Sequence, residues 1–160
     1  MASRMELVAG DTREILAVVG TDDSEAFSDA SRFRAYLSLS GGMDPTWLDL
    51  FAEAARVATE RDAPIDFIDA RGDLGGGGSD GEPVADLTIE RVDPSWISAV
   101  AAIPDITLDG VAGRWIDRLE EELGALPREE KPWIRELAGN LVRFCRTADR
   151  APDVLFLWSL

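Results

Sequence analysis

The alternation of apolar and polar residues predicts short β-strands across the first two thirds of the chain. Residues 33–40 place an apolar side chain at every second position, which is the period of a strand with one buried face. Residues 64–70 and 83–92 contain similar short apolar runs, and each predicts a further strand. Residues 5–9 and 14–20 are rich in aliphatic and β-branched residues, so we expect either two strands of a hairpin or one interrupted strand there.

Two similar segments predict the starts of helices. "MDPTWL" at 43–48 and "VDPSWI" at 92–97 each place an aspartate, which can cap a helix, before a proline that suits the first helical position. Trp47 and Trp96 would lie in the first turns and anchor the helices to the sheet. The similarity covers about six residues, so it leaves open whether the segments arose by duplication. A shorter helix is expected at 24–32.

From residue 107 the spacing of apolar residues changes to that of helices packed on a core. We expect Thr107 to cap a first helix and Gly124 to end it. The buried stripe of this helix is predicted to be Leu108, Val111, Ala112, Trp115, Ile116, Leu119 and Leu123. A second helix from about residue 128 would bury Trp133, Ile134, Leu137, Ala138, Leu141, Val142, Cys145 and Ala148. The two predict a helical hairpin at 107–150.

The last segment, "DVLFLWSL" at 153–160, is almost continuously apolar and follows Pro152. It predicts a strand covered on both faces, buried inside the sheet. The whole pattern predicts an α+β fold with a single mixed or antiparallel sheet of about five to six strands and helices packed on it. We expect residues 1–160 to form one globular domain that contains a flexible glycine-rich loop at 72–83.

The composition predicts the cellular compartment of the protein and the type of organism that makes it. No apolar run approaches the length of a membrane span, and the first residues lack the apolar core of a signal peptide. Cys145 is the only cysteine, so no intramolecular disulfide can form, which suits a reducing compartment. Lys131 is the only lysine among 16 basic residues, a bias typical of bacteria with GC-rich genomes. We therefore expect a cytoplasmic bacterial protein.

The charge of the chain narrows the classes of partner. The sequence has 31 acidic and 16 basic residues, a formal net charge of −15. Such a field repels nucleic-acid phosphates and anionic lipids and favours encounter with a basic protein. Binding to nucleic acids and to membranes is therefore not expected, whereas a basic protein partner and a homodimer are both compatible with the sequence.

The absence of histidine is the most informative negative feature of the chemistry. It excludes Ser-His-Asp and Cys-His catalysis and the histidine-containing metal sites. Carboxylates could still serve an enzyme or a divalent cation, and Asp66, Asp69 and Asp73, around the end of one predicted strand, are the candidates. Asp22, Asp23 and Glu25 form a second such cluster, and neither cluster has the spacing of a known cation loop.

The segment "RGDLGGGGSDGE" at 71–82 invites several ligand hypotheses that its neighbours do not support. A phosphate-binding loop requires a lysine and a hydroxyl residue after the glycines and then a helix, whereas Asp80, Glu82 and a predicted strand follow here. A calcium-binding repeat is matched in its letters by Gly75, Gly76, Gly78 and Asp80. That repeat works only as a stack of several copies, and this chain has a single copy. We interpret the segment as a solvated connection between two strands.

These features favour a small acidic protein with a non-catalytic, protein-binding role, for example one that neutralises a basic partner. The alternative is a carboxylate-dependent enzyme, or a binder of a small ligand or metal ion, that uses acids at strand ends near the glycine-rich loop. Cys145 lies in the middle of an apolar helical stripe, so we interpret it as a buried structural residue. The sequence predicts no cofactor site or metal site, and Asp66, Asp69 and Asp73 remain its candidates for a catalytic role.

Overall fold

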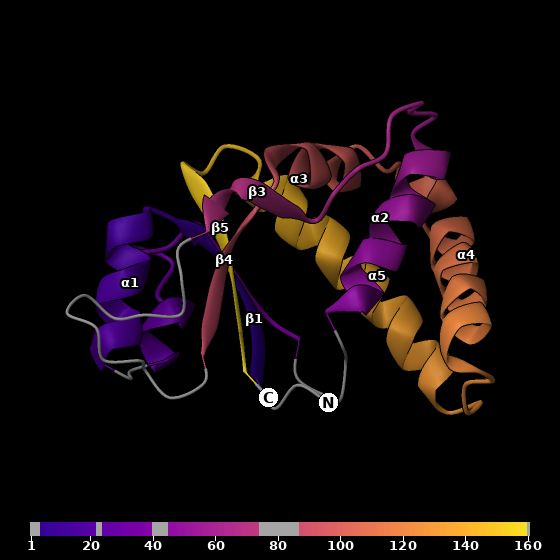
Figure 1. The fold of residues 1–160 in the computed structure, drawn as a ribbon, viewed down its shortest axis with the longest axis horizontal. Helices are drawn as coiled ribbons and strands as arrows, with labels where there is room; N and C mark the ends of the chain where they lie inside the picture. The colour runs from indigo at the N-terminus through magenta and orange to yellow at the C-terminus, as the bar shows by residue number, and fades with distance from the viewer. Residues whose placement is uncertain (1–3, 22–23, 40–44, 74–86, 160) are drawn as a thin grey trace.

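The computed structural model describes residues 4–21, 24–39, 45–73 and 87–159, and it contains one five-stranded antiparallel sheet (Figure 1). The strands are β1 (Arg4–Gly10), β2 (Ala35–Ser38), β3 (Ile68–Asp73), β4 (Thr88–Val92) and β5 (Asp153–Ser159). Their order across the sheet is β2-β1-β5-β4-β3. The α+β class and the interior position of the last strand, both predicted from the sequence, are confirmed.

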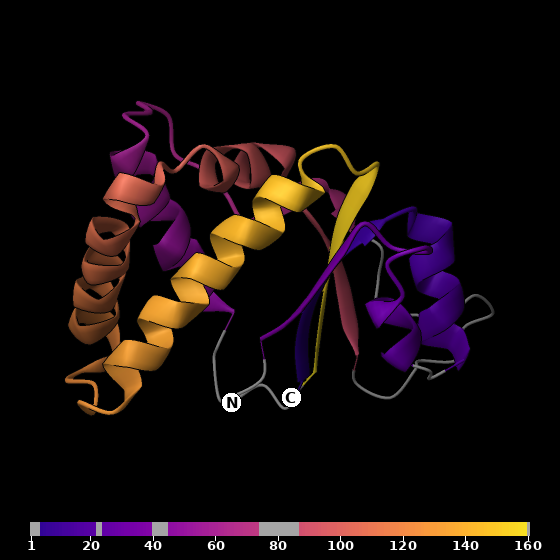
Figure 2. The same cartoon turned by 180° about the vertical axis from the view of Figure 1, so that it is seen from behind.

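Helices cover both faces of this sheet. The helical elements are α1 (Thr12–Thr21), the 3-10 helix η1 (Ser24–Ser28), α2 (Thr46–Ala58), α3 (Pro94–Ala101), α4 (Asp105–Leu123) and α5 (Glu130–Ala148). Figures 1 and 2 show α1 on one side of the sheet and α2, α3, α4 and α5 on the other. None of the helices in the described part of the chain combines the length and the apolar character needed to cross a membrane.

The position of β5 in the middle of the sheet explains why the sequence of this strand is continuously apolar. Val154 and Phe156 of β5 face the large core formed with α2 to α5, whereas Leu155 and Leu157 face the smaller core formed with α1 and η1. All four side chains are buried. Because successive side chains of a strand point to opposite faces, a strand covered on both sides has no polar face.

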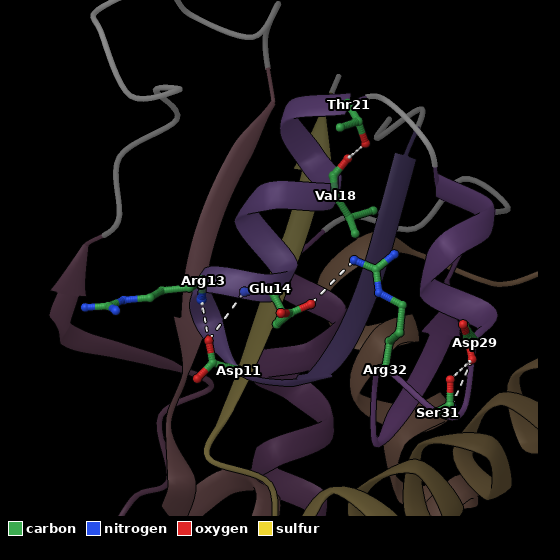
Figure 3. A network of polar contacts seen from close by, with 8 residues as sticks. All are labelled: Asp11, Arg13, Glu14, Val18, Thr21, Asp29, Ser31 and Arg32. Atoms are coloured by element: carbon green, nitrogen blue, oxygen red, sulfur yellow. Dashed lines mark hydrogen bonds and ion pairs between the residues drawn. The ribbon is translucent and has the colours of Figure 1, made fainter.

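The segment at 14–20 is helical, so the expected strand there is wrong. The carboxylate of Asp11 accepts a hydrogen bond from the backbone N–H of Arg13 at 2.9 Å, which is the arrangement of a helix N-cap (Figure 3). The buried residues Ile15, Val18 and Val19 then have helical spacing. Their β-branched side chains indicated a strand, but the cap and the tertiary packing outweighed that weak preference.

Both predicted helix starts at the Asp-Pro segments coincide with helices. In α3, Asp93 accepts a hydrogen bond from Ser95 N at 2.8 Å, and Pro94 occupies the first turn. Trp96 is fully buried, and its ring lies 4.8 Å from that of Phe67, which in turn contacts Phe156 of the sheet. The capping residue expected for α2, Asp44, lies outside the described residues.

The aromatic contacts of Trp47 in α2 are with residues of other helices. Its ring lies 6.5 Å from that of Trp115 and 6.3 Å from that of Trp133. Trp115 Nε1 also donates a 2.8 Å hydrogen bond to the carbonyl of Trp47. The sequence could not show these contacts, because Trp115 of α4 lies 68 positions further along the chain.

The predicted helical hairpin is confirmed, with a different start. The helix α4 begins at Asp105, and Thr107 lies in its first turn, where its N–H donates to the carbonyl of Pro104 at 3.0 Å. Thr107 is therefore not the cap. Gly124 ends α4 at a φ of 90°, in the left-handed region that favours glycine. Leu123 was predicted to belong to the buried stripe, but it is 54% exposed, so that part of the prediction is wrong.

Two further boundaries differ from the expected ones. The third strand begins at Ile68, later than the predicted 64–70 segment, and extends to Asp73. Residues 72 and 73 of the predicted loop are therefore part of β3, and residues 74–83 lie outside the described residues. The helix expected at 24–32 is the short 3-10 helix η1, followed by a turn in which Asp29 accepts hydrogen bonds from Ser31 (Figure 3).

Candidate functional site

An acidic groove runs along the outer side of α2. It is lined by Asp49, Glu53 and Arg56 of the helix and by Asp62, Pro64 and Ile65 of the segment that follows, with a volume of about 390 Å³. The inner side of α2 is buried through its apolar residues: Trp47, Leu48, Phe51, Ala52, Ala54 and Ala55. That amphipathic pattern leaves the polar positions on the outer side, where they form one wall of the groove.

A tight reversal of the chain after α2 forms the other wall. Glu60 adopts a φ of 55°, and Arg61 N donates to the carbonyl of Arg56 at 3.1 Å. The guanidinium of Arg56 donates back to the carbonyl of Arg61 at 3.2 Å. These two bonds hold the segment that carries Asp62 beside the end of the helix.

The pKa of one groove carboxylate, that of Asp49, is shifted by its surroundings. Partial burial raises the pKa of Asp49, the negative charge of Asp66 raises it further, and a hydrogen bond from the backbone of Phe67 opposes these effects. Asp66 is exposed, so its charge is well hydrated. Asp49, which lines the groove, therefore carries its negative charge under the influence of the like charge of Asp66.

The acidic surface continues from the groove onto α4 through one arginine. Arg118 forms ion pairs with Glu53 at 3.1 Å, with Glu121 at 2.6 Å and with Glu122 at 3.8 Å. These hydrogen bonds and charges raise the pKa of the guanidinium, the contact with Glu121 most of all. One cation is thus surrounded by three carboxylates, and the local charge remains negative.

The three carboxylates proposed from the sequence lie in different environments. Asp66 is exposed beside Asp49, whereas Asp69 is 8% exposed within β3. Asp73 is opposite Glu90 in the ladder with β4, and its side chain is outside the description. Within the residues that the structure describes, no group of three or more acidic or cysteine residues is placed to hold a metal ion.

The acidic residues that line the groove, Asp49, Glu53 and Asp62, are not among the candidates from the sequence. The signal was present, because Asp49, Glu53 and Arg56 follow one another at helical spacing on the polar side of α2. What the sequence could not indicate is the position of Asp66, which is brought to this helix by the return of the chain toward β3.

The other sequence candidates contribute little to this surface. Asp22 and Asp23 lie outside the described residues, as do Gly75, Gly76, Gly78 and Asp80, and Glu25 is exposed on η1. Cys145 is completely buried in α5, and burial, together with the charge of Asp149, raises the pKa of its thiol well above the usual value. The thiol is therefore protonated in the folded protein.

Comparison with known proteins gives no further information about this surface. No protein-family model matches the chain, and no solved structure matches it.

Proposed function

We propose that this protein has a non-catalytic role in which it binds a basic protein partner, with lysine or arginine side chains of the partner entering the acidic groove. The observation that carries this proposal is the gathering of Asp49, Glu53 and Asp62 along one groove, where partial burial and then the charge of Asp66 raise the pKa of Asp49. A cation placed between two such carboxylates removes the repulsion and adds two attractions. Positive charge is therefore the property of a ligand that the groove favours most.

The lining of the groove suits long basic side chains. Pro64 and Ile65 supply apolar surface beside Asp49, Glu53 and Asp62. Lysine and arginine place their aliphatic stems on apolar surface while the charged head stays near water and carboxylates. A small inorganic cation would make no use of the apolar residues.

The charge of the whole molecule supports the same partner. A net charge of −15 accelerates encounter with a basic protein over distances longer than direct contacts reach. Neutralisation of a basic enzyme or toxin would make use of this field. The single, buried cysteine suits a reducing compartment, so we place this role in the cytoplasm.

The test measures binding of a fluorescein-labelled decalysine peptide by anisotropy at low and at high salt concentration. Asp49→Asn combined with Asp66→Asn should weaken binding at low salt, and high salt should abolish the difference. The matched control combines Glu25→Gln on η1 with Glu136→Gln on α5, because both residues are exposed and the loss of net charge is the same.

Equal weakening by the groove variant and by the control would show that only net charge matters and would contradict the proposed groove. Failure of the unmodified protein to bind the peptide at low salt would contradict a basic partner. A rise in melting temperature with Mg²⁺ or Ca²⁺ that Asp69→Asn removes would favour a metal-dependent function instead.

A further inference from the structure

A second cavity lies where α5 leads into β5. Its volume is about 90 Å³, and it is lined by residues of β4, α3, the end of α5 and the start of β5: Arg91, Val92, Pro94, Ile97, Ala148, Asp149, Ala151, Pro152, Asp153 and Val154. Figure 1 shows α3 beside the upper ends of α5 and β5. The cavity shares no lining residue with the acidic groove.

The polar side of this cavity carries charges of both signs. Arg91 Nε lies 3.4 Å from Asp153 Oδ1, and Asp149 adds a second carboxylate at the end of α5. Thr12 donates a 2.7 Å hydrogen bond to the other oxygen of Asp153, which fixes the orientation of that carboxylate. Arg91 Nε is buried beside Asp153, whereas the Arg91 side chain as a whole is 32% exposed.

The opposite side of the cavity is apolar. Val92, Ile97, Ala148 and Val154 are each at most 6% exposed and present aliphatic surface. The site therefore combines one guanidinium, two carboxylates and a small aliphatic wall. A volume of about 90 Å³ limits a ligand to a small organic molecule.

We propose that this cavity binds a small zwitterion of the α-amino acid type. The carboxylate of such a ligand would accept from Arg91, and its ammonium group would donate to Asp149 or Asp153. Both ligand charges are attached to one carbon atom, so they lie side by side as the charges of Arg91 and Asp153 do. The ligand side chain would lie against the aliphatic wall.

Ligands with a single charge fit this arrangement less well. The carboxylates of Asp149 and Asp153 repel an anion that approaches Arg91, and Arg91 repels a simple amine that approaches Asp153. A zwitterion avoids both repulsions because each of its charges meets the opposite charge.

Isothermal titration calorimetry on the full chain tests the proposal with three probes of similar shape. These are L-valine, which is a zwitterion, L-valinamide, which has only the positive charge, and N-acetyl-L-valine, which has only the negative charge. We expect L-valine to bind saturably with a dissociation constant of about 1 mM or lower, and each of the other probes to bind at least about tenfold more weakly.

Variants of the cavity separate this site from non-specific binding. Ala151→Leu should fill the cavity and abolish binding of L-valine while leaving the charges in place, and Asp149→Asn should weaken binding at an exposed position. Arg150→Gln is the matched control, because Arg150 is exposed next to Asp149 and does not line the cavity. Circular dichroism and thermal unfolding verify that each variant is folded.

Absence of saturable binding by L-valine would overturn the proposal, and so would equal binding of L-valinamide or unchanged binding after Ala151→Leu. Binding of L-valine should be retained in the protein that carries Asp49→Asn and Asp66→Asn. The two proposals can therefore fail independently.

Discussion

Thr12 Oγ1 donates a 2.7 Å hydrogen bond to Asp153 Oδ2 and so joins the first turn of α1 to the first residue of β5. The two residues are 141 positions apart in sequence. The same carboxylate forms an ion pair with Arg91 of β4, so three elements meet at Asp153. Asp153 is thus a junction of α1 with two neighbouring strands of the sheet.

Replacement of Thr12 by valine should lower the free energy of unfolding by about 1 kcal/mol, because the partly buried Asp153 loses a donor while the shape of the side chain is kept. Urea denaturation measures the change. Thr147→Val is the control, since the hydroxyl of Thr147 bonds only within its own exposed helical turn, to the carbonyl of Arg143. A loss no greater than that of the control would show that the junction contributes nothing to stability.

Asp93→Ala should lower the free energy of unfolding by about 1 kcal/mol, because the backbone N–H of Ser95 loses its acceptor at the start of α3. Asp93→Asn keeps an acceptor at the same position and should retain most of the stability. Thermal unfolding of both variants under identical conditions provides the comparison. Equal destabilisation by alanine and asparagine would exclude the capping role.

Asp49 should make stability depend on pH in the acidic range. Its pKa is raised above the ordinary value of 3.8 in the folded protein, so ionisation is less favourable in the folded state than in the unfolded state. The resulting destabilisation is present at neutral pH and disappears as the pH falls through the folded-state pKa toward and below 3.8. Asp49→Asn should therefore stabilise the protein at pH 7, with the advantage lost in acid.

The measurement for Asp49 is chemical denaturation at a series of pH values in the unmodified protein and in Asp49→Asn. Asparagine keeps a carbonyl that can accept from Phe67, so the comparison isolates the charge. Destabilisation by Asp49→Asn at pH 7 would mean that the attraction to the backbone exceeds the burial and the repulsion from Asp66.

Cys145 should react with a thiol reagent such as 5,5′-dithiobis(2-nitrobenzoate) only slowly until the protein unfolds. The residue is inaccessible, and its raised pKa keeps the reactive thiolate scarce. The same shift implies that stability falls as the pH rises past the ordinary thiol pKa of 9.0, because only the unfolded state ionises readily there. Labelling of the native protein as fast as in denaturant would contradict the buried position.

A chain that ends at Asp153 should not accumulate as soluble protein. Removal of residues 154–160 takes away the partner of both β1 and β4 and four buried side chains of the two cores. Removal of Leu160 alone is the control. Soluble expression of the shorter chain with an unchanged circular dichroism spectrum would contradict the central position of β5.

Secondary structure was predicted correctly from the sequence where all local signals favoured the same element. The stripe on α5 and the apolar run of β5 each had a single period or composition, and both were assigned correctly. The segment at 14–20 combined β-branched residues with a helical cap at Asp11, and its composition misled the assignment. Asp11 is a residue type that commonly caps helices, so the sequence did contain a signal for a helix at this position.

The candidate sites depended on contacts between distant segments and were therefore harder to predict. Asp66 could be proposed because it lies near a predicted strand. Asp49, whose pKa it influences, belongs to the preceding helix α2, and the chain reverses between the two residues. The cavity at Arg91 and Asp153 joins residues more than 60 positions apart. Neither neighbour is indicated by spacing, since no sequence period connects them.

The position of β5 also has a consequence for the order of folding. The antiparallel pairs β1–β2 and β3–β4 do not pair with each other, because β5 lies between them and pairs with both. During synthesis the ribosome must therefore release residues 153–159 before the two halves of the sheet can join. Until then β1 and β4 lack the strand that pairs with both of them. The nascent chain is therefore most prone to aggregation, and most accessible to chaperones, during this interval.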